Sequence, residues 1–211
     1  MRAEAISQSA LISAAQAAAE IQLAYATNGT SLAQAALAGA HHCEEFRHYP
    51  ANDASDPVAR TRFYYHAHTS QRYPRDEHGH FHLFHYGDSG KGDDFCHLIG
   101  LSLDARGNAL RWFTTNRWVT GERWLTAAQM EAILADYRIL VRGRLAPVAR
   151  WLTAMVTLFA SDISDAMQER DQIMSEKILR IGDEAAFEDR NLDVITERPV
   201  SLPARLCELQ G

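Results

Sequence analysis

The residues best suited to chemistry are histidines, and all ten of them lie between His41 and His97. Two dense motifs stand out within this window: HAH at residues 66–68 and EHGHFH at residues 77–82. Imidazole nitrogens are common ligands of transition metals, and bonds of about 2.0–2.1 Å require several rings to converge on one point. The two motifs therefore predict a metal site. The candidate ligands are His66, His68, His78, His80 and His82.

A pair of β-strands would bring these rings together, because successive side chains of a strand point to opposite faces of a sheet. The three histidines of the second motif then share one face, whereas Phe81 and Leu83 share the other and can fill a core. The first motif shows the same two-residue step. If the chain turns back between residues 69 and 77, the two motifs lie on adjacent antiparallel strands, with opposed Cβ atoms about 4.5–5.5 Å apart.

The identity of the ion depends on Glu77, the candidate carboxylate beside the second motif. With two histidines, Glu77 would complete the facial triad of non-haem iron, whereas three histidines and water would suit catalytic zinc. Fe or Zn are the expected ions, with Mn or Cu as alternatives. Glu77 would otherwise act as a general base.

Two arginines in the turn between the histidine motifs, Arg72 and Arg75, could grip an anionic substrate. The alternative is a solvated turn in which they pair with an aspartate. Arg72 is a candidate catalytic residue together with Glu77, and Arg75 is a candidate contact of the substrate or partner.

Three metal-free interpretations of the histidines stay open at this level. The rings could be solvated on an open sheet face, could form a polar network with tyrosine and glutamate, or could act as a pH switch. The sequence also leaves open whether His41, His42, Cys96 or His97 joins the cluster.

A second candidate element is the segment RWFTTNRWVTGERW, which holds three of the four tryptophans. Large aromatic side chains with interleaved polar groups suit contacts with a substrate or a protein partner. The residues expected to make these contacts are Trp112, Asn116, Arg117 and Trp118. The alternative is that the tryptophans fill the space where the last strand meets the following helix.

The elements that must position these residues indicate an α+β fold in a single domain over residues 1–211. Short β-type runs separated by turn residues predict an antiparallel sheet of four to five strands over about residues 60–116. An Ala-rich helical hairpin is expected over 3–48, a break over 49–57, helices over 126–180, and an edge strand with a tail over 190–211. Thr126 is predicted to start a helix that continues to Val141, and Pro147 is predicted to lie in the first turn of the next helix.

Residues 64–70 (YYHAHTS), 77–84 (EHGHFHLF) and 114–122 (TTNRWVTGE) resemble an uncharacterised bacterial family, a domain of unknown function with an HxH…EHGHFH signature. The resemblance runs from about Arg60 to beyond Arg170 and implies no activity. Locally, residues 81–87 (FHLFHYG) look like the α-class carbonic anhydrase strand in which two histidines separated by one residue bind zinc. The match would fall on His80 and His82, or on His82 and His85 with two residues between them instead of one, and the rest of the chain does not fit that family. The HxH motif at 66–68 is similar to that of cupins, but the glutamate expected a few residues later is absent.

Composition excludes several classes of protein. With 211 residues, 46% of them hydrophobic, and a net charge of −6, the chain suits a globular protein and argues against duplex nucleic acid as a partner. Three cysteines without a CxxC pair indicate a reducing, cytoplasmic environment, and no apolar run of about 18 residues predicts a membrane span.

The leading hypothesis is a metal-dependent oxygenase, hydrolase or lyase acting on a small anionic or carbonyl-bearing substrate. The alternative is a non-catalytic accessory subunit that binds a protein partner through its tryptophan-rich segment. Metal content separates the two.

Overall fold

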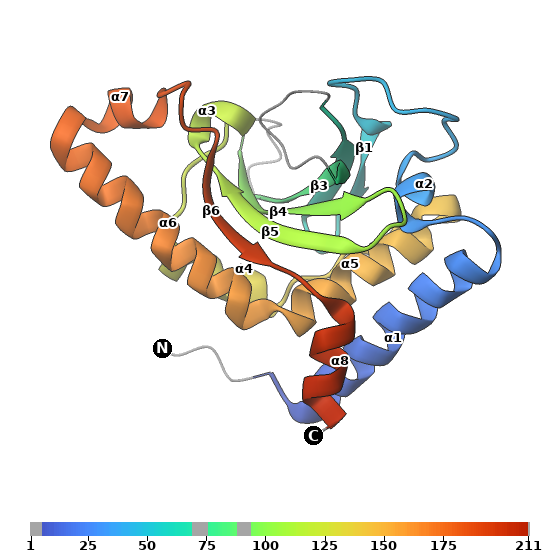
Figure 1. The fold of residues 1–211 in the computed structure, drawn as a ribbon. Helices are drawn as coiled ribbons and strands as arrows, with labels where there is room; N and C mark the ends of the chain where they lie inside the picture. The colour runs from blue at the N-terminus through green and yellow to red at the C-terminus, as the bar shows by residue number, and fades with distance from the viewer. Residues whose placement is uncertain (1–5, 69–75, 88–93, 211) are drawn as a thin grey trace.

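The computed structural model describes residues 6–68, 76–87 and 94–210, and its centre is an antiparallel sheet of six strands (Figure 1). The strands pair in chain order, each antiparallel to the next. They are β1 (Tyr49–Asp56), β2 (Thr61–His66), β3 (Glu77–Tyr86), β4 (Phe95–Asp104), β5 (Ala109–Thr115) and β6 (Val194–Pro199). The α+β class and the antiparallel sheet are confirmed, and the expected strand count of four to five was slightly low.

The additional strand is β1, which occupies residues expected to form a break. Pro50 made a strand seem improbable, because proline cannot donate a hydrogen bond to a neighbouring strand. β1 lies at the edge of the sheet, where one side of the strand needs no partner, so proline is tolerated there. Its Tyr49 and Ala54 are buried against the core.

The helices are, in chain order, α1 (Gln8–Thr27), α2 (Leu32–Ala36), α3 (Arg117–Thr120), α4 (Ala127–Ala135), α5 (Ala146–Leu158), α6 (Ala160–Ile181), α7 (Asp183–Phe187) and α8 (Leu202–Gln210). Thr126 caps α4 in a capping box with Gln129, and Pro147 lies in the first turn of α5, both as predicted. Within the described ranges, no helix combines the length and apolar character needed to cross a membrane.

Two helices are shorter than expected. The second helix of the N-terminal hairpin ends at Ala36, because Ala38 and Gly39 take left-handed backbone angles that a helix cannot continue through. The helix from Thr126 ends at Ala135 and not at Val141. Ile139 is fully buried beyond that end, and its amide donates to the Thr153 hydroxyl at 3.1 Å, so tertiary packing overrides the helical spacing.

One face of the sheet carries the hydrophobic core. Figure 1 shows α1, α4, α5 and α6 along that side of the curved sheet. Phe81 of β3 lies 6.5 Å from the Trp151 ring of α5, and Trp112 of β5 lies 6.4 Å from the Phe159 ring, measured between ring centroids. Burying each such side chain stabilises the fold by roughly 1.5–3 kcal/mol. This face anchors the strands, and the opposite face carries the candidate site.

Candidate metal centre

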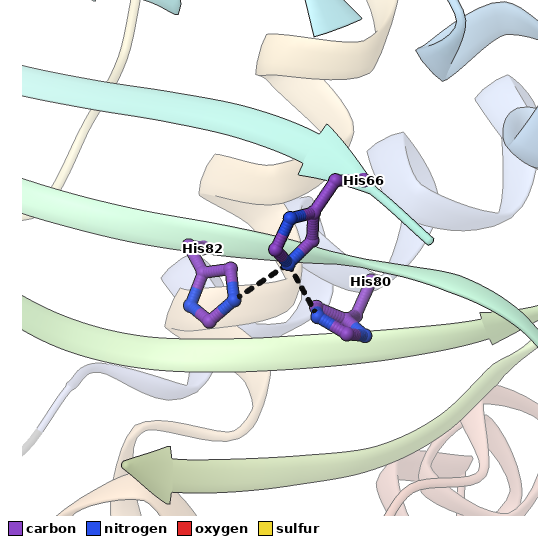
Figure 2. A group of neighbouring side chains, drawn as sticks. All are labelled: His66, His80 and His82. Carbon is purple, nitrogen blue, oxygen red and sulfur yellow. Dashed lines mark hydrogen bonds between the residues drawn. The ribbon is translucent and has the colours of Figure 1, made fainter. Parts of the chain in front are cut away.

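Three imidazole rings from adjacent strands converge on one point, as the alternating spacing predicted. The register pairs His66 of β2 with His80 of β3, and His82 follows two residues later on the same face. The Nε2 atom of His66 lies 2.7 Å from Nε2 of His80 and 3.1 Å from Nε2 of His82 (Figure 2). Two nitrogens bound to one ion at about 2.0–2.1 Å lie roughly 3.0–3.5 Å apart. The three histidines therefore form a cluster that could hold a metal ion with small adjustments of the rings.

All three rings are buried, and burial keeps His66 and His82 neutral. Burial, together with the nearby His80 and His68, lowers the pKa of His66 to about 2. Burial, with His97 beside it, also holds the pKa of His82 well below its usual value. Neutral imidazole is the form that coordinates a metal, so His66 and His82 can coordinate at neutral pH without losing a proton.

Glu77 fixes the orientation of His80 through the ring nitrogen that faces away from the other two histidines. Its Oε1 atom lies 2.5 Å from Nδ1 of His80, and Arg111 donates to its Oε2 atom at 3.1 Å. Burial raises the pKa of Glu77, but the hydrogen bond with His80 and the charge of Arg111 outweigh it and leave that pKa below its ordinary value. An ionised carboxylate accepts the Nδ1–H of His80, which leaves the Nε2 lone pair facing the centre. Both carboxylate oxygens are thus engaged away from the point where the three nitrogens meet.

His97, on the neighbouring strand β4, fixes the orientation of His82 in the same way, through Nδ1 of that ring. Its Nε2 atom lies 2.9 Å from Nδ1 of His82, and its own Nδ1 atom lies 3.0 Å from the Thr115 hydroxyl. When Nε2 of His82 faces the centre, its Nδ1–H donates to His97, which in turn donates to Thr115. Burial and the charge of Arg170 lower the pKa of His97 to about 3, so this ring is also neutral.

The backbone of His97 is fixed by Glu122, whose carboxylate accepts a hydrogen bond from the His97 amide. Burial raises the pKa of Glu122 to about 8. Sequence reasoning did not single out Glu122 or Thr115. No local pattern marks them, because both reach His97 from other parts of the chain.

A β-bulge explains why Glu77 reaches the site face. Glu77 pairs with Asp104 and Gly79 with Leu103, so His78 is an extra residue without a partner on β4. The extra residue reverses the alternation of side chains, which turns Glu77 toward the histidines. The expectation that His78 shares a face with His80 and His82 is corrected here, because the Nδ1 atom of His78 lies 2.8 Å from the hydroxyl of Tyr65, a residue of the core face.

A second bulge brings in His97. Leu83 pairs with Ile99 and Phe84 with His97, so Leu98 is the extra residue on β4. If these residues alternated regularly, His97 would share the core face with Ile99, two residues away. Glu77 and His97, which contact the Nδ1 atoms of His80 and His82, thus each face the cluster because of a β-bulge.

The remaining histidines surround the cluster or lie apart from it. His68 is half-buried beside the cluster, with its ring centroid 4.5 Å from that of His66 and 5.4 Å from that of His80. His48 stacks on Tyr64 at 3.6 Å. The side chains of His41 and His42 are exposed, and Cys96 lies in the hydrophobic core.

A cavity of about 490 Å³ opens above the three rings. Its lining comes from the segment before β1, from the strands of the histidine face, from α3 and from the start of β6. The lining residues are Phe46, His48, Tyr64, His66, His68, His80, His82, Phe113, Thr115, Trp118, Val119, Asp193 and Val194.

Residues 12–200 match a protein family described as Domain of unknown function (DUF6969). The chain belongs to this family. No curated protein and no solved structure matches the chain. The matched part of this DUF6969 domain includes every residue of the cluster and the residues that hold it, so the site lies within the family's own region.

The four residues of the tryptophan-rich segment that were expected to contact a substrate or partner lie in different environments in this DUF6969 domain. Trp112 is fully buried in the core between the sheet and the helices, on the face opposite the histidines. Asn116 is also buried, where it caps α3 and donates to the Ala186 carbonyl, and Arg117 pairs with Glu184 and Glu188 near α7. Trp118 alone of these four residues lines the cavity. Arg72 and Arg75 lie outside the described residues.

Proposed function

We propose that this DUF6969 protein binds one transition-metal ion through the Nε2 atoms of His66, His80 and His82. The observation that carries the proposal is the combination of three converging nitrogens with two anchored rings. Glu77 and His97 engage the Nδ1 atoms of His80 and His82, which is the arrangement that orients metal-bound imidazoles in proteins. Structural networks of histidine do not require such a common direction.

We propose further that the ion serves catalysis. His66, His80 and His82 would hold such an ion, and the chemistry that it would supply is polarisation of a water molecule or a substrate oxygen. The all-nitrogen donor set suits Zn or Fe(II), with Mn or Cu as alternatives. The open cavity above the rings gives a small molecule access to that point. A hydrolase, lyase or oxygenase acting on an oxygen-bearing substrate, carbonyl or anionic, is consistent with this arrangement.

The chain's own groups would have separate tasks. Glu77 and His97 would fix the direction of two ligands. His68, half-buried at the cavity beside His66, would accept a proton from a substrate oxygen or return it. Tyr64 and Phe113 flank the rings and would exclude bulk water from the reacting atoms.

The direct test is metal content. Protein purified without an affinity tag and without chelator, then reconstituted with Zn, Fe(II), Mn or Cu, should retain about one ion per chain by elemental analysis. His66→Ala and His82→Ala should each abolish retention. His85→Ala is the matched control, because His85 is a histidine of the same strand β3 outside the cluster, and it should retain the ion. A parent protein that retains none of the four metals would refute the proposal.

A second candidate is a non-catalytic protein that docks a partner. Two observations favour it: the rings of the cluster satisfy one another through hydrogen bonds at 2.7 and 3.1 Å, and Phe46 is 70% exposed beside the cavity. A metal-free parent that remains folded would support this reading. Trp118→Ala should then weaken the complex while leaving the unfolding transition unchanged.

A further inference from the structure

We infer that the hydroxyl of Thr115 donates a hydrogen bond into the cavity and selects substrates that carry an acceptor, such as a carbonyl or ether oxygen, besides the atom bound to the ion. This inference rests on the proposed metal site, because coordination by His82 sets the direction of the hydrogen bonds that lead to Thr115. It gives Thr115 a part in substrate recognition in addition to its contact with His97.

A chain of hydrogen bonds crosses three adjacent strands from the cluster to Thr115. His82 lies on β3, His97 on β4 and Thr115 on β5. Nδ1 of His82 lies 2.9 Å from Nε2 of His97, and Nδ1 of His97 lies 3.0 Å from the Thr115 hydroxyl oxygen. All three residues are buried, so each polar group of the chain depends on the next one for its hydrogen bond.

A metal ion at the cluster would fix the direction of every bond in this chain. When Nε2 of His82 coordinates, the proton of that neutral ring lies on Nδ1 and is donated to Nε2 of His97. His97 then carries its own proton on Nδ1 and donates it to the Thr115 oxygen. The Thr115 hydroxyl is thus the acceptor in its bond with His97, and its own proton is directed elsewhere.

The proton of the Thr115 hydroxyl has no acceptor among the residues that the structure describes, where His97 is the partner of this side chain. The neighbouring Thr114 shows the opposite case. It points to the core face, and its hydroxyl oxygen lies 2.6 Å from that of Thr196. Thr115 lines the cavity instead. Because a buried donor without a partner costs free energy, an acceptor atom of a bound molecule would complete its hydrogen bonding.

The cavity wall around Thr115 offers no substitute for such an acceptor. Phe113 precedes Thr115 on the same face of β5, and Val119 and Val194 also line the cavity. The carboxylate of Asp193 accepts a hydrogen bond from the Val194 amide at 3.1 Å, and the described contacts of Thr115 do not include it. A substrate without an acceptor would therefore leave the hydroxyl proton unpaired in a largely apolar wall, which weakens its binding.

The first test locates the ring protons in the Zn(II)-loaded full-length protein with isotope-labelled histidine. Long-range proton–nitrogen NMR assigns each proton to Nδ1 or Nε2. We expect protons on Nδ1 of both His82 and His97. A proton on Nε2 of His97 would overturn the inference, because Thr115 would then donate to His97 and not into the cavity.

The second test uses the Co(II)-loaded full-length protein and two matched pairs of thiols. The sulfur binds the ion, and the change in absorption of Co(II) reports binding. In the pair 2-methoxyethanethiol and 1-butanethiol, an ether oxygen that accepts but cannot donate is replaced by a methylene group. The pair 3-methoxypropanethiol and 1-pentanethiol places that oxygen one carbon further from the sulfur. The measured quantity is the ratio of the two affinities within each pair.

Variants assign this ratio to the hydroxyl. Thr115→Val keeps the shape of the side chain and should lower the preference for the ether by about fivefold or more in at least one pair. Thr115→Ser should restore it. A role of Thr115 confined to holding His97 would change both members of a pair equally and leave the ratio unchanged. Thr114→Val is the matched control on the core face of the same strand, and it should leave the ratio as in the parent.

The outcomes separate this inference from the proposed function. A parent that takes up no Co(II) refutes the metal site itself. A loaded parent whose ratios are unchanged by Thr115→Val in both pairs refutes only the role of Thr115. If Thr115→Val does not retain Co(II), the proton on His97 in the Zn(II)-loaded parent decides between the two directions of the chain.

Discussion

On β3, Phe81 and Leu83 point toward the helices, whereas His80 and His82 point to the opposite face and meet other imidazoles. Both pairs are almost completely buried. Apolar side chains gain from burial in any tight packing, but a buried imidazole costs free energy unless its nitrogens have partners. The core face is therefore stable without specific hydrogen-bond partners. The histidine face depends on hydrogen bonds, which Glu77, His97 and Thr115 supply to the imidazole nitrogens.

The largest expected effect separates stability from metal binding. Phe81→Ala should lower the free energy of unfolding by about 3–5 kcal/mol, because it leaves a cavity in the core. The folded fraction should still retain one ion per chain. His82→Ala should instead abolish retention in protein that circular dichroism shows to be folded. Urea unfolding and elemental analysis measure the two quantities, and loss of the ion from folded Phe81→Ala protein would show that the two faces are not independent.

A smaller effect is expected when Glu77 is changed, because Glu77 orients the metal ligand His80 and does not itself bind the ion. Glu77→Gln should weaken metal affinity about 10–100-fold, because an amide is a poorer acceptor for Nδ1–H of His80 than a carboxylate. Competition with a chromophoric chelator measures this. Glu197→Gln is the matched control: Glu197 also pairs with Arg111 but is 52% exposed and does not touch the cluster. Equal affinities of parent and Glu77→Gln protein would leave the carboxylate without a role at the site.

The smallest effect is the pH dependence of stability in chelator-treated protein. The pKa of His97 is about 3 in the folded protein and about 6.5 in the unfolded chain, so the unfolded state takes up the proton first. The contribution of neutral His97 to the free energy of unfolding is complete above pH 6.5. It is lost as the pH falls toward 3, by about 1.4 kcal/mol per pH unit for this histidine. Urea midpoints at pH 7.5, 6 and 5 measure the slope.

A pair of variants assigns that slope to the buried rings. His97→Gln should remove one histidine's share of it, whereas His41→Gln, at an exposed position, should leave it unchanged. A slope that is the same in all three proteins would place its origin outside the cluster.

Much of this arrangement could be predicted because it follows from regular alternation. The two-residue steps placed His66, His80 and His82 together, and the β-type runs predicted the central four strands. The capping box at Thr126 marked the start of α4. These features depend on neighbours along the chain or on one pairing of adjacent strands.

The features that escaped prediction depend on contacts with distant residues. The position of His78 was misassigned because a bulge is not visible in the alternation, and His97 could not be assigned to either face for the same reason. Trp112 and Trp118 look equivalent in the sequence, but they lie on opposite sides of the sheet layer. Helix α4 ends early because burial of Ile139 stabilises the fold more than another helical turn would.

The single unpaired residue in each of β3 and β4 has a consequence for how this protein tolerates insertions and deletions. Removing His78 would join Glu77 directly to Gly79, so Glu77 would stay opposite Asp104 and its carboxylate would still face the histidines. Removing Leu98 would likewise leave His97 opposite Phe84 and on the histidine face. A loss of one codon at either place should therefore be tolerated better than a one-residue deletion elsewhere in these strands, because it removes the irregularity without moving the remaining side chains to the other face.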